Sequence, residues 1–344
     1  MNRKTARKLK RGVVVTLLFV AAFFGLVEVL AWTNIRSERR KRAYLGDELF
    51  RRVEGKGPPI VFIAGLQGST RYWGNKLQSL RTSRRLIYVD LYGFGQSPWP
   101  LKEPALEDHL AWLRRTLVAE GATREVTIVA HSFGAIVAAE YAARYPGEMR
   151  DVYLLGAPVF RNESEARERI HDMSELAAAF SLNPLLAREA CLTMGAFRPL
   201  FRRILPKFAR KGSPEVLEDA VLHDWPSING AIQNVLLTKP IATPVMKLGQ
   251  LVTFVHGTRD RVTPLPRIRE LAAATAAKVV VLPVDHQGYV SSGGAPWIEL
   301  LNSPQLKAVS QAVLPRRYGG ERVVMRDSQH EPLREGRSAM TPSA

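Results

Sequence analysis

The stretch "VTIVAHSFGAIV", residues 126–137, joins an apolar, β-branched run to a run of small helix-forming residues around a single serine. A change from strand to helix pattern within so few residues is typical of a strand–turn–helix unit. Ser132 stands at the junction, where it either caps the helix or is held as a nucleophile on a tight turn. A nucleophile on such a turn needs small residues two positions before and after it, here Ala130 and Gly134, because larger side chains would collide with the neighbouring strand and helix.

The rest of the chain repeats the alternation of strand and helix patterns. Apolar or β-branched runs occur at 58–65, 85–91, 126–131, 151–158, 251–257 and 278–285, with helical stretches such as "EDHLAWLRRTLVAEG" between them. Near-continuous apolar strands separated by helices are typical of a parallel sheet that is covered on both faces. The sequence therefore predicts an α/β fold with a mostly parallel, doubly wound sheet.

One long interval interrupts this alternation. Residues 160–247 contain no convincing buried strand, and prolines divide them into several short helical stretches. So long a connection between two strands is better explained as a helical cap that rests on the strand ends, where open α/β sheets bind ligands. The α/β core is then expected at 58–159 and 248–315.

The N-terminus has the pattern of a membrane anchor. A tail at 1–11 holds six basic residues, and the stretch 12–32 that follows is apolar except for Glu28. Twenty-one such residues form a helix of about 30 Å, the thickness of a bilayer core. A cleaved signal peptide is the alternative, although no A-x-A site follows the apolar run. Residues 33–57 are expected to form a charged helical neck, and the polar tail at 316–344 to be disordered.

The positive charge of the chain is concentrated next to this apolar segment. The net charge is +17, and residues 1–42 contribute eleven basic against two acidic residues. We therefore expect a bilayer, and no nucleic acid, as the partner of these charges. Because a cationic N-terminal tail is hard to translocate, a single-pass anchor with an extracytoplasmic catalytic domain is expected.

Two further candidate site residues follow neighbouring strands. Asp260 lies in "GTRDRVTP" after the run 251–257, and His286 lies in "LPVDHQGYV" after the run 278–285. In a parallel sheet the carboxyl ends of all strands meet at one edge, which brings both residues to Ser132. A serine hydroxyl needs an imidazole to take its proton and a carboxylate to orient that imidazole. The chain order Ser, Asp, His is that of hydrolases with a nucleophile elbow.

Other acids could orient the histidine. Glu163 follows the run 151–158, and Asp285 adjoins His286 in the chain, although that adjacency is a poor geometry for orienting the ring. Two backbone amides could stabilise an oxyanion, those of Leu66 in "FIAGLQGS" and of Phe133 at the start of the helix.

Five motifs in order resemble the α/β-hydrolase fold superfamily, in particular its serine esterase and lipase branch with a helical cap. They are "AGLQGS", "DLYGFGQSPWP", "AHSFGA", "GTRDRVTP" and "DHQGYV". The resemblance implies catalysis by Ser132, Asp260 and His286, with Leu66 and Phe133 forming the oxyanion hole. Two departures stand out, since Ala64 replaces the usual histidine of the oxyanion motif and Ala130 replaces the usual glycine of the elbow.

Other kinds of site find little support. The single cysteine, Cys191, excludes an internal disulfide, and no histidine spacing is typical of a metal site. Neither a dinucleotide fingerprint nor a Walker motif is complete, so no cofactor is expected. Basic residues in "RPLFRRILPKFARK" alternate with apolar ones. They could rest on an anionic bilayer, bind a carboxylate-bearing substrate or simply be solvated.

Together these patterns predict a membrane-anchored serine hydrolase that cleaves a small-molecule or lipid ester through an acyl-enzyme. The same triad would also serve an acyltransferase or a hydrolase of C–C or amide bonds. A membrane-tethered binding protein that keeps the fold without catalysis is the alternative outside the enzymes.

Overall fold

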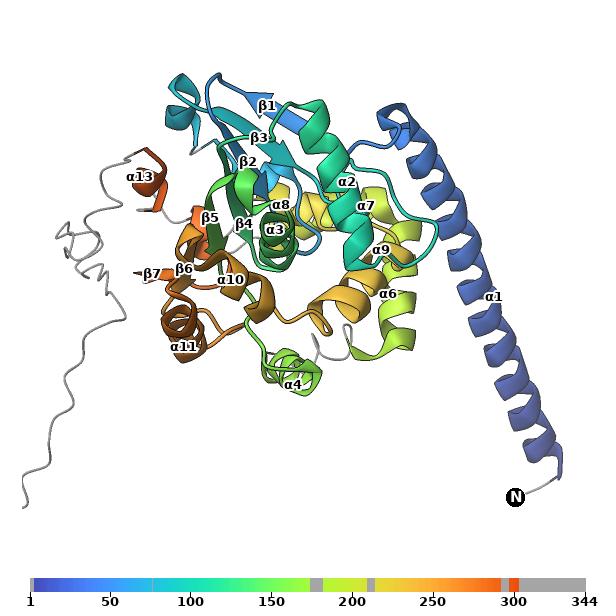
Figure 1. The fold of residues 1–344 in the computed structure, drawn as a ribbon. Coiled ribbons are helices and arrows are strands. Elements are labelled where there is room, and N and C mark those ends of the chain that lie inside the picture. The colour runs from blue at the N-terminus through green and yellow to red at the C-terminus, as the bar shows by residue number, and fades with distance from the viewer. Residues whose placement is uncertain (1–2, 76, 174–181, 209–213, 292–296, 303–344) are drawn as a thin grey trace, which may run out of the picture.

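The computed structural model describes residues 3–75, 77–173, 182–208, 214–291 and 297–302. Its strands are β1 (Arg51–Glu54), β2 (Pro59–Ile63), β3 (Arg85–Val89), β4 (Val126–His131), β5 (Met149–Leu155), β6 (Val252–Gly257) and β7 (Lys278–Leu282). They form one sheet in the order β1-β3-β2-β4-β5-β6-β7, in which only β1 is antiparallel to its neighbour. The predicted α/β fold with a mostly parallel sheet is confirmed, and all six predicted strands are present (Figure 1).

Alternating side chains of the strands build two separate cores on the two faces of the sheet. Val61 and Ile63 belong to one cluster with residues of α2 (Leu106–Ala119), α3 (Phe133–Arg144), α10 (Ala242–Leu248) and α11 (Leu265–Thr275). Ile60 and Phe62 belong to the other cluster, with the short helical turns at 70–73 and 78–82 and with α13 (Trp297–Asn302). Strands buried on both sides explain why their sequences are almost entirely apolar.

The cap interval is helical wherever the structure describes it. It holds α4 (Glu163–Met173), α6 (Pro184–Ala196), α7 (Arg198–Ile204), α8 (Pro214–Asp219) and α9 (Trp225–Gly230), which continues as a π-helical turn over Ala231–Leu236. No strand occurs among the described residues of 160–247. The helix α10 packs against α3 and α11, so the helical cover of the sheet resumes at Ala242, before the expected boundary at 248.

The segment expected to be a neck, 33–57, differs from the prediction. Its first part continues the helix of the apolar segment, so that α1 runs without interruption over Arg3–Arg42. Its last part contains β1, which pairs with β3, so the sheet begins at Arg51 rather than near Pro58. The sequence "RRVE" is a half-buried edge strand, and its charged residues hide the apolar alternation of a strand.

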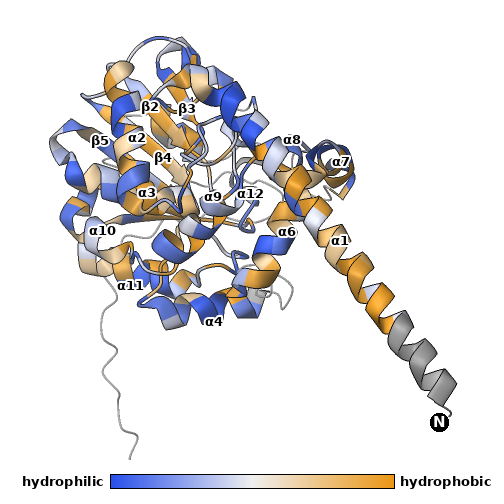
Figure 2. Ribbon diagram, turned by 90° about the vertical axis from the view of Figure 1, so that its right-hand side faces the viewer, coloured by the Kyte–Doolittle hydropathy of each residue, from blue (hydrophilic) through white to orange (hydrophobic). Residues whose placement is uncertain are grey.

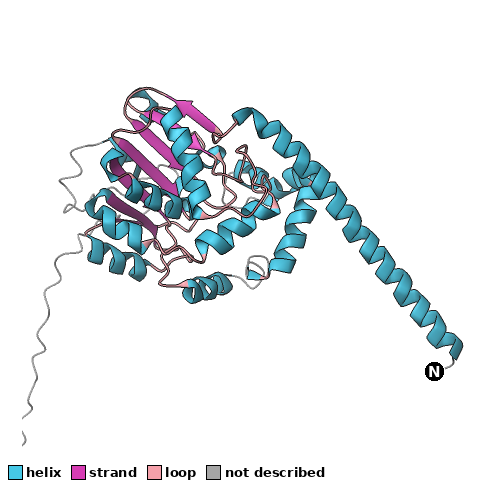
Figure 3. Ribbon diagram, turned by 45° about the vertical axis from the view of Figure 1, so that its right-hand side comes forward, coloured by secondary structure: helices cyan, strands magenta, loops and turns pink. Residues whose placement is uncertain are grey.

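The helix α1 projects away from the body of the protein and carries a long hydrophobic surface (Figure 2). Among the described helices it alone is long and apolar enough to cross a membrane, and only 6% of its apolar window is buried. Its C-terminal half packs along α6, where Val27 and Ala31 are fully buried against Leu192 and Ala196. Figure 3 shows the same division between the compact domain and the protruding helix.

The predicted tail at 316–344 and the end of the core from 303 lie outside the described residues. The short helix α12 (Gly288–Ser291) lies between β7 and α13.

Candidate active site

Ser132 sits on a strained turn between β4 and α3. Its backbone has φ 51° and ψ −122°, a conformation that residues other than glycine rarely adopt. Its N–H donates to the carbonyl of Leu155 on β5 at 2.9 Å, which fixes the turn to the neighbouring strand. A Cβ atom on Gly134 would lie 2.4 Å from the carbonyl oxygen of Ala64, so only glycine fits there. Ala130 is buried in β4, where the structure accommodates its methyl group.

Three residues from distant parts of the chain form a hydrogen-bonded row at this edge. His286 Nε2 lies 2.9 Å from Ser132 Oγ, and His286 Nδ1 lies 2.9 Å from Asp260 Oδ2. Asp260 follows β6 and His286 follows β7, so the parallel sheet brings both to the end of β4. The Asp260 side chain is fully buried, whereas His286 keeps 18% of its side chain exposed. This is the arrangement in which an imidazole can remove the serine proton.

Asp260 is held as a carboxylate by several donors. Tyr289 OH donates to its Oδ2 at 2.7 Å, and the backbone N–H of Val262 donates to its Oδ1 at 2.9 Å. Burial by itself would raise the pKa of Asp260, but the hydrogen bonds from His286 and Tyr289 outweigh it and lower the pKa to about 2. The carboxylate is therefore charged at neutral pH and can stabilise an imidazolium. Tyr289 is in turn fixed by the N–H of Gly257, which donates to its OH at 2.9 Å.

His131, the residue before the nucleophile, supports the histidine loop and was not predicted from the sequence. Its Nε2 lies 2.8 Å from the carbonyl oxygen of His286, so this nitrogen must carry the proton and donate. Its ring stacks on Tyr72 with centroids 4.9 Å apart. Burial and the neighbouring His286 lower the pKa of His131 to about 3, which keeps the ring neutral. The only sequence signal for this contact is the "AHS" triplet itself.

The loop after β2 approaches the nucleophile closely. A Cβ atom on Gly65 would lie 3.1 Å from Ser132 Cβ, and the N–H of Gly68 closes the turn on the Gly65 carbonyl at 3.0 Å. Within the described part of the chain, neither Leu66 nor Phe133 donates its backbone N–H to a loop or turn acceptor. Phe133 also opens α3, at the positive end of that helix. Of the two amides predicted for the oxyanion hole, that of Leu66 thus lies in the loop after β2 and that of Phe133 in the first turn of α3.

The "DLYGFGQS" motif serves the framework of the site. The carboxylate of Asp90 accepts hydrogen bonds from the N–H groups of Thr70 at 2.5 Å and Gln96 at 2.7 Å. It therefore joins the loop after β3 to the loop that follows Leu66. Full burial raises the pKa of Asp90 to about 7, although these two hydrogen bonds oppose the shift. Gly95, at φ 55°, lies against the same carboxylate, because a Cβ atom there would come within 2.1 Å of Asp90 Oδ2.

The alternative acids lie elsewhere. Glu163 begins α4 and forms an ion pair with Arg167 at 2.7 Å. Asp285 is exposed and accepts a hydrogen bond from the N–H of Gln287 at 3.2 Å. Neither carboxylate contacts the His286 ring among the interactions of the described residues, whereas Asp260 does.

The cap is joined to the loop after β2 by polar contacts. Asp219 on α8 accepts from Ser69 Oγ at 2.8 Å and from Arg71 Nη1 at 2.9 Å. His223 Nε2 lies 3.4 Å from Gln67 Nε2, next to Leu66. These contacts were not predicted, because nothing in the cap sequence indicates which loop it meets. They place cap residues beside the loop that flanks the nucleophile.

Among the residues that the structure describes, no group of three or more His, Cys, Asp or Glu side chains could hold a metal ion.

Comparison with known proteins places this geometry in a family. The family model of the alpha/beta hydrolase fold matches residues 58–291, which is more than half of the chain. Among curated proteins, the chain is 31% identical over 124 residues to the probable lysophospholipase BODYGUARD 2 of Arabidopsis thaliana, covering 34% of this chain and 26% of that protein. It is 23% identical over 272 residues to the probable lysophospholipase BODYGUARD 4 of the same plant, covering 73% and 65%. The matches thus cover less than two thirds of these relatives' own lengths.

Solved structures show the same fold. A carboxylesterase of the thaumarchaeon Nitrososphaera gargenis superposes with a TM-score of 0.58 at 19% identity, covering 76% of this chain and 95% of that one. An esterase from Rhodococcus sp. ECU1013 gives 0.53 at 24% identity, covering 75% and 94%. With the matched family model and the observed sheet, these findings show that the chain belongs to the α/β-hydrolase fold family.

Proposed function

We propose that the protein is a membrane-anchored serine hydrolase that cleaves carboxylic esters through Ser132, His286 and Asp260. The single observation that carries this proposal is the unbroken row of hydrogen bonds from Asp260 through His286 to Ser132. A row of this kind, with a buried carboxylate at one end and a half-buried serine on a strained turn at the other, supports nucleophilic catalysis.

In the first half of the reaction, Ser132 Oγ attacks the ester carbonyl carbon while His286 Nε2 takes the hydroxyl proton. The negative charge moves to the carbonyl oxygen, where the N–H groups of Leu66 and Phe133 donate to it. The tetrahedral intermediate collapses by breaking the ester C–O bond, and His286 returns its proton to the leaving alkoxide as the alcohol departs. The acyl group is now bound to Ser132 Oγ.

In the second half, a water molecule replaces the alcohol. His286 takes a proton from the water as its oxygen attacks the acyl carbon, and the new tetrahedral intermediate expels Ser132 Oγ, which regains the proton. Asp260 stays ionised throughout, in agreement with its lowered pKa, and offsets the positive charge that His286 carries in both steps. The products are a carboxylic acid and an alcohol.

The membrane anchor is part of the same proposal. The exposed apolar surface of α1 supports a span over 12–32, and the catalytic domain is proposed to lie outside the cytoplasm. The contacts of the helix argue against its removal as a signal peptide, since Val27 and Ala31 are fully buried on α6. Asn34 Nδ2 also donates to the carbonyl of Ala196 at 2.9 Å.

The substrate class follows from this placement. An active site held next to a bilayer favours an ester with a long acyl chain, and two relatives named as probable lysophospholipases support a lipid ester. The carboxylesterase and esterase folds among the solved structures agree with the chemistry of ester cleavage.

Hydrolysis of p-nitrophenyl esters with acyl chains of graded length tests the proposal. The full-length protein in detergent should release p-nitrophenol, and Ser132→Ala should reduce kcat by a factor of about 10³ or more. Ser83→Ala, an exposed serine far from the site, is the control and should keep full activity. Equal rates for Ser132→Ala and the unmodified protein would exclude Ser132 as the nucleophile.

A further inference from the structure

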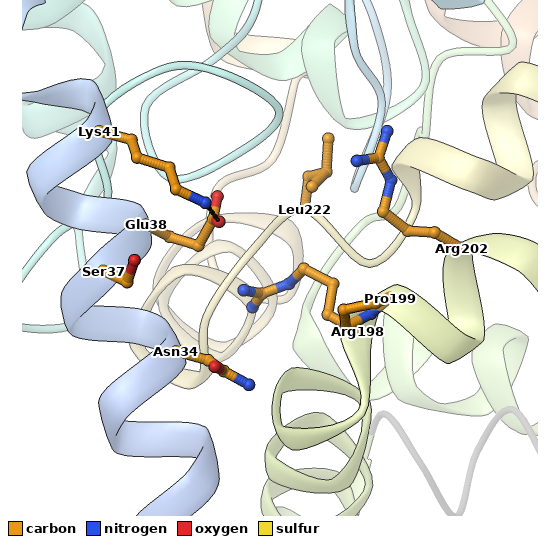
Figure 4. A pocket seen from close by; sticks show the side chains of 8 residues that line it. All are labelled: Asn34, Ser37, Glu38, Lys41, Arg198, Pro199, Arg202 and Leu222. Atoms are coloured by element: carbon orange, nitrogen blue, oxygen red, sulfur yellow. Dashed lines mark hydrogen bonds and ion pairs between the residues drawn. The ribbon is translucent and has the colours of Figure 1, made fainter.

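A cavity lies where the anchor helix meets the cap, and no residue of the Ser132 site lines it. Its volume is about 270 Å³, and its lining residues come from α1 (Asn34, Ser37, Glu38, Lys41), from α7 (Arg198, Pro199, Arg202) and from Leu222. The four residues of α1 stand at positions i, i+3, i+4 and i+7, so they form one polar stripe along the helix. Figure 4 shows this stripe facing the side chains of α7 across the cavity.

Arg198 gives the cavity its chemical character. The residue is only 5% exposed, and its guanidinium donates to the carbonyls of Val221 at 3.0 Å and His223 at 3.2 Å. It also lies over the ring of Trp99, 4.7 Å from the ring centroid. No carboxylate among the described residues forms an ion pair with Arg198. The acids that act on it through space, Glu38 and Asp224, are each paired with other cations. Such a buried positive charge costs free energy unless an anion approaches it.

The surroundings add to this positive charge. Glu38, the one acid that lines the cavity, binds both Lys41 at 2.8 Å and Arg42. Lys41 and Arg42 therefore share the single negative charge of Glu38, and Arg198 adds a third positive charge. In Figure 4 the guanidinium of Arg198 extends from α7 toward α1, between Glu38 and Asn34. An anionic group of modest size in the cavity would meet this guanidinium directly.

The position of the cavity along α1 indicates where such an anion would come from. Its first lining residue, Asn34, follows the expected end of the span at Trp32 by two residues, and Lys41 lies about 10 Å further along the helix. The polar headgroup layer occupies roughly 5–7 Å on each side of the hydrocarbon core. The end of the cavity at Asn34 is thus at the depth in the bilayer where lipid phosphates lie.

The position of the neighbouring helix α6 is consistent with this depth. Glu28 pairs with Arg188 at 2.7 Å and Asn34 bonds to Gly195 at 3.2 Å, so α1 and α6 run in the same direction. The first turn of α6 therefore lies beside the apolar part of α1. Leu185 in this turn is exposed, with 76% of its surface accessible, and lies at the level of what would be the acyl region.

We propose that this cavity binds the phosphate group of a membrane lipid, with Arg198 as its main contact and Lys41 as a second. The proposal rests on the proposed span of α1, because the span sets the level of the cavity. The ligand differs from the ester that is cleaved at Ser132, since none of the Ser132 site residues lines this cavity. A lipid held here would fix the orientation of the cap relative to the bilayer.

Native mass spectrometry of the full chain in detergent, in the Ser132→Ala background, measures this binding without turnover. The probes are phosphatidylglycerol, a diacylglycerol with the same acyl chains but no phosphate, and inorganic phosphate. We expect one phosphatidylglycerol adduct, and a diacylglycerol adduct that is at least tenfold weaker. Competition by inorganic phosphate would further support an anion site.

Two variants with the same change of charge separate the cavity from the rest of the helix. Ser37→Glu places a carboxylate in the cavity at an exposed position, and it should weaken the phosphatidylglycerol adduct at least tenfold. Arg40→Gln, exposed on the same helix but outside the cavity, should leave the adduct unchanged. Arg198 also holds two backbone carbonyls, so Arg198→Gln is informative only alongside a melting curve.

Equal affinity of Ser37→Glu and the unmodified chain for phosphatidylglycerol would overturn the proposal. Binding of inorganic phosphate without any lipid adduct would overturn the lipid source and assign the cavity to a soluble phosphate. Because the readout is binding, its failure is distinct from the failure of ester hydrolysis at Ser132. The span itself is tested separately, by extraction of the protein from membranes with alkaline carbonate.

Discussion

At the scale of single residues, the backbone of Ser132 is strained, and neighbouring residues must stabilise its conformation. A non-glycine residue in such a conformation costs roughly 1–3 kcal/mol. The hydrogen bond to Leu155 and the close approach of Gly134 to Ala64 offset this cost. The replacement of the usual glycine of the elbow by Ala130 adds little strain, because the methyl group is accommodated within β4.

A pair of substitutions tests this difference between the two small residues. Gly134→Ala should destabilise the fold by several kcal/mol and abolish activity, because its Cβ would lie 2.4 Å from the Ala64 carbonyl. Ala130→Gly should cost only about 1 kcal/mol and keep the activity. Denaturant unfolding and ester hydrolysis measure both effects. An active, stable Gly134→Ala would contradict the tight elbow.

Tyr289 is expected to position Asp260 rather than to touch substrate. Tyr289→Phe removes the hydroxyl that bonds Asp260 and leaves the N–H of Gly257 without its acceptor, at a cost of about 1–3 kcal/mol. The pKa of Asp260 should rise, and the carboxylate, with one donor fewer, should stabilise the protonated imidazole more strongly. The acid limb of the kcat/KM profile should therefore shift to higher pH. A change in stability with an unmoved acid limb would limit Tyr289 to a structural role.

Asp260 also makes stability depend on pH. Its pKa is lowered from 3.8 to about 2 in the folded protein, so its contribution of about 2 kcal/mol is complete above pH 4 and is lost as the pH falls toward 2. The difference in unfolding free energy between the unmodified protein and Asp260→Asn should therefore shrink over this range. Urea unfolding at several pH values measures this difference in unfolding free energy. A difference that stays constant with pH would show that the partners of Asp260 do not lower its pKa.

Residue patterns predicted Ser132, Asp260 and His286 because each follows a strand, and the parallel sheet then brings strand ends together. The supports could not be predicted in the same way. His131 contacts a backbone carbonyl, and Tyr289 reaches back to Asp260 across a turn. Such contacts depend on the path of the loops and leave no periodic trace in the sequence.

At the scale of elements, the strands were predictable and the edges of the domains were not. Apolar runs indicate buried strands, whereas β1 is a short, charged edge strand that only its pairing with β3 reveals. The cap was predictable as helical, but its attachment depends on polar contacts between distant segments. Asp219 makes such a contact, because it joins α8 to Ser69 and Arg71.

Removing this attachment should loosen the cap. Asp219 is only 4% exposed, and Asp219→Ala leaves the buried hydroxyl of Ser69 without its acceptor. The substitution should cost about 1–3 kcal/mol, with an increase in KM for esters. Glu218→Ala, which removes a more exposed partner of Arg71, is the matched control and should cost less than about 1 kcal/mol. Equal effects of the two substitutions would show that burial of Asp219 is unimportant.

At the scale of the whole molecule, one helix joins the proposed membrane span to the cap. Glu28 and Asn34 of α1 bind α6, and Arg39 pairs with Asp224 near the loops around the site. The anchor is therefore continuous with the folded domain rather than joined to it by a flexible neck. This arrangement would hold the Ser132 edge at a fixed height above the bilayer.

The nucleophile assignment is tested most directly by a fluorophosphonate probe, which reacts only with an activated serine, followed by peptide mapping of the labelled full-length protein. We expect one modified residue, Ser132, and a loss of labelling in His286→Ala, because His286 Nε2 lies 2.9 Å from the serine oxygen. Labelling at another residue, or an unlabelled Ser132 in a folded protein, would contradict the assignment.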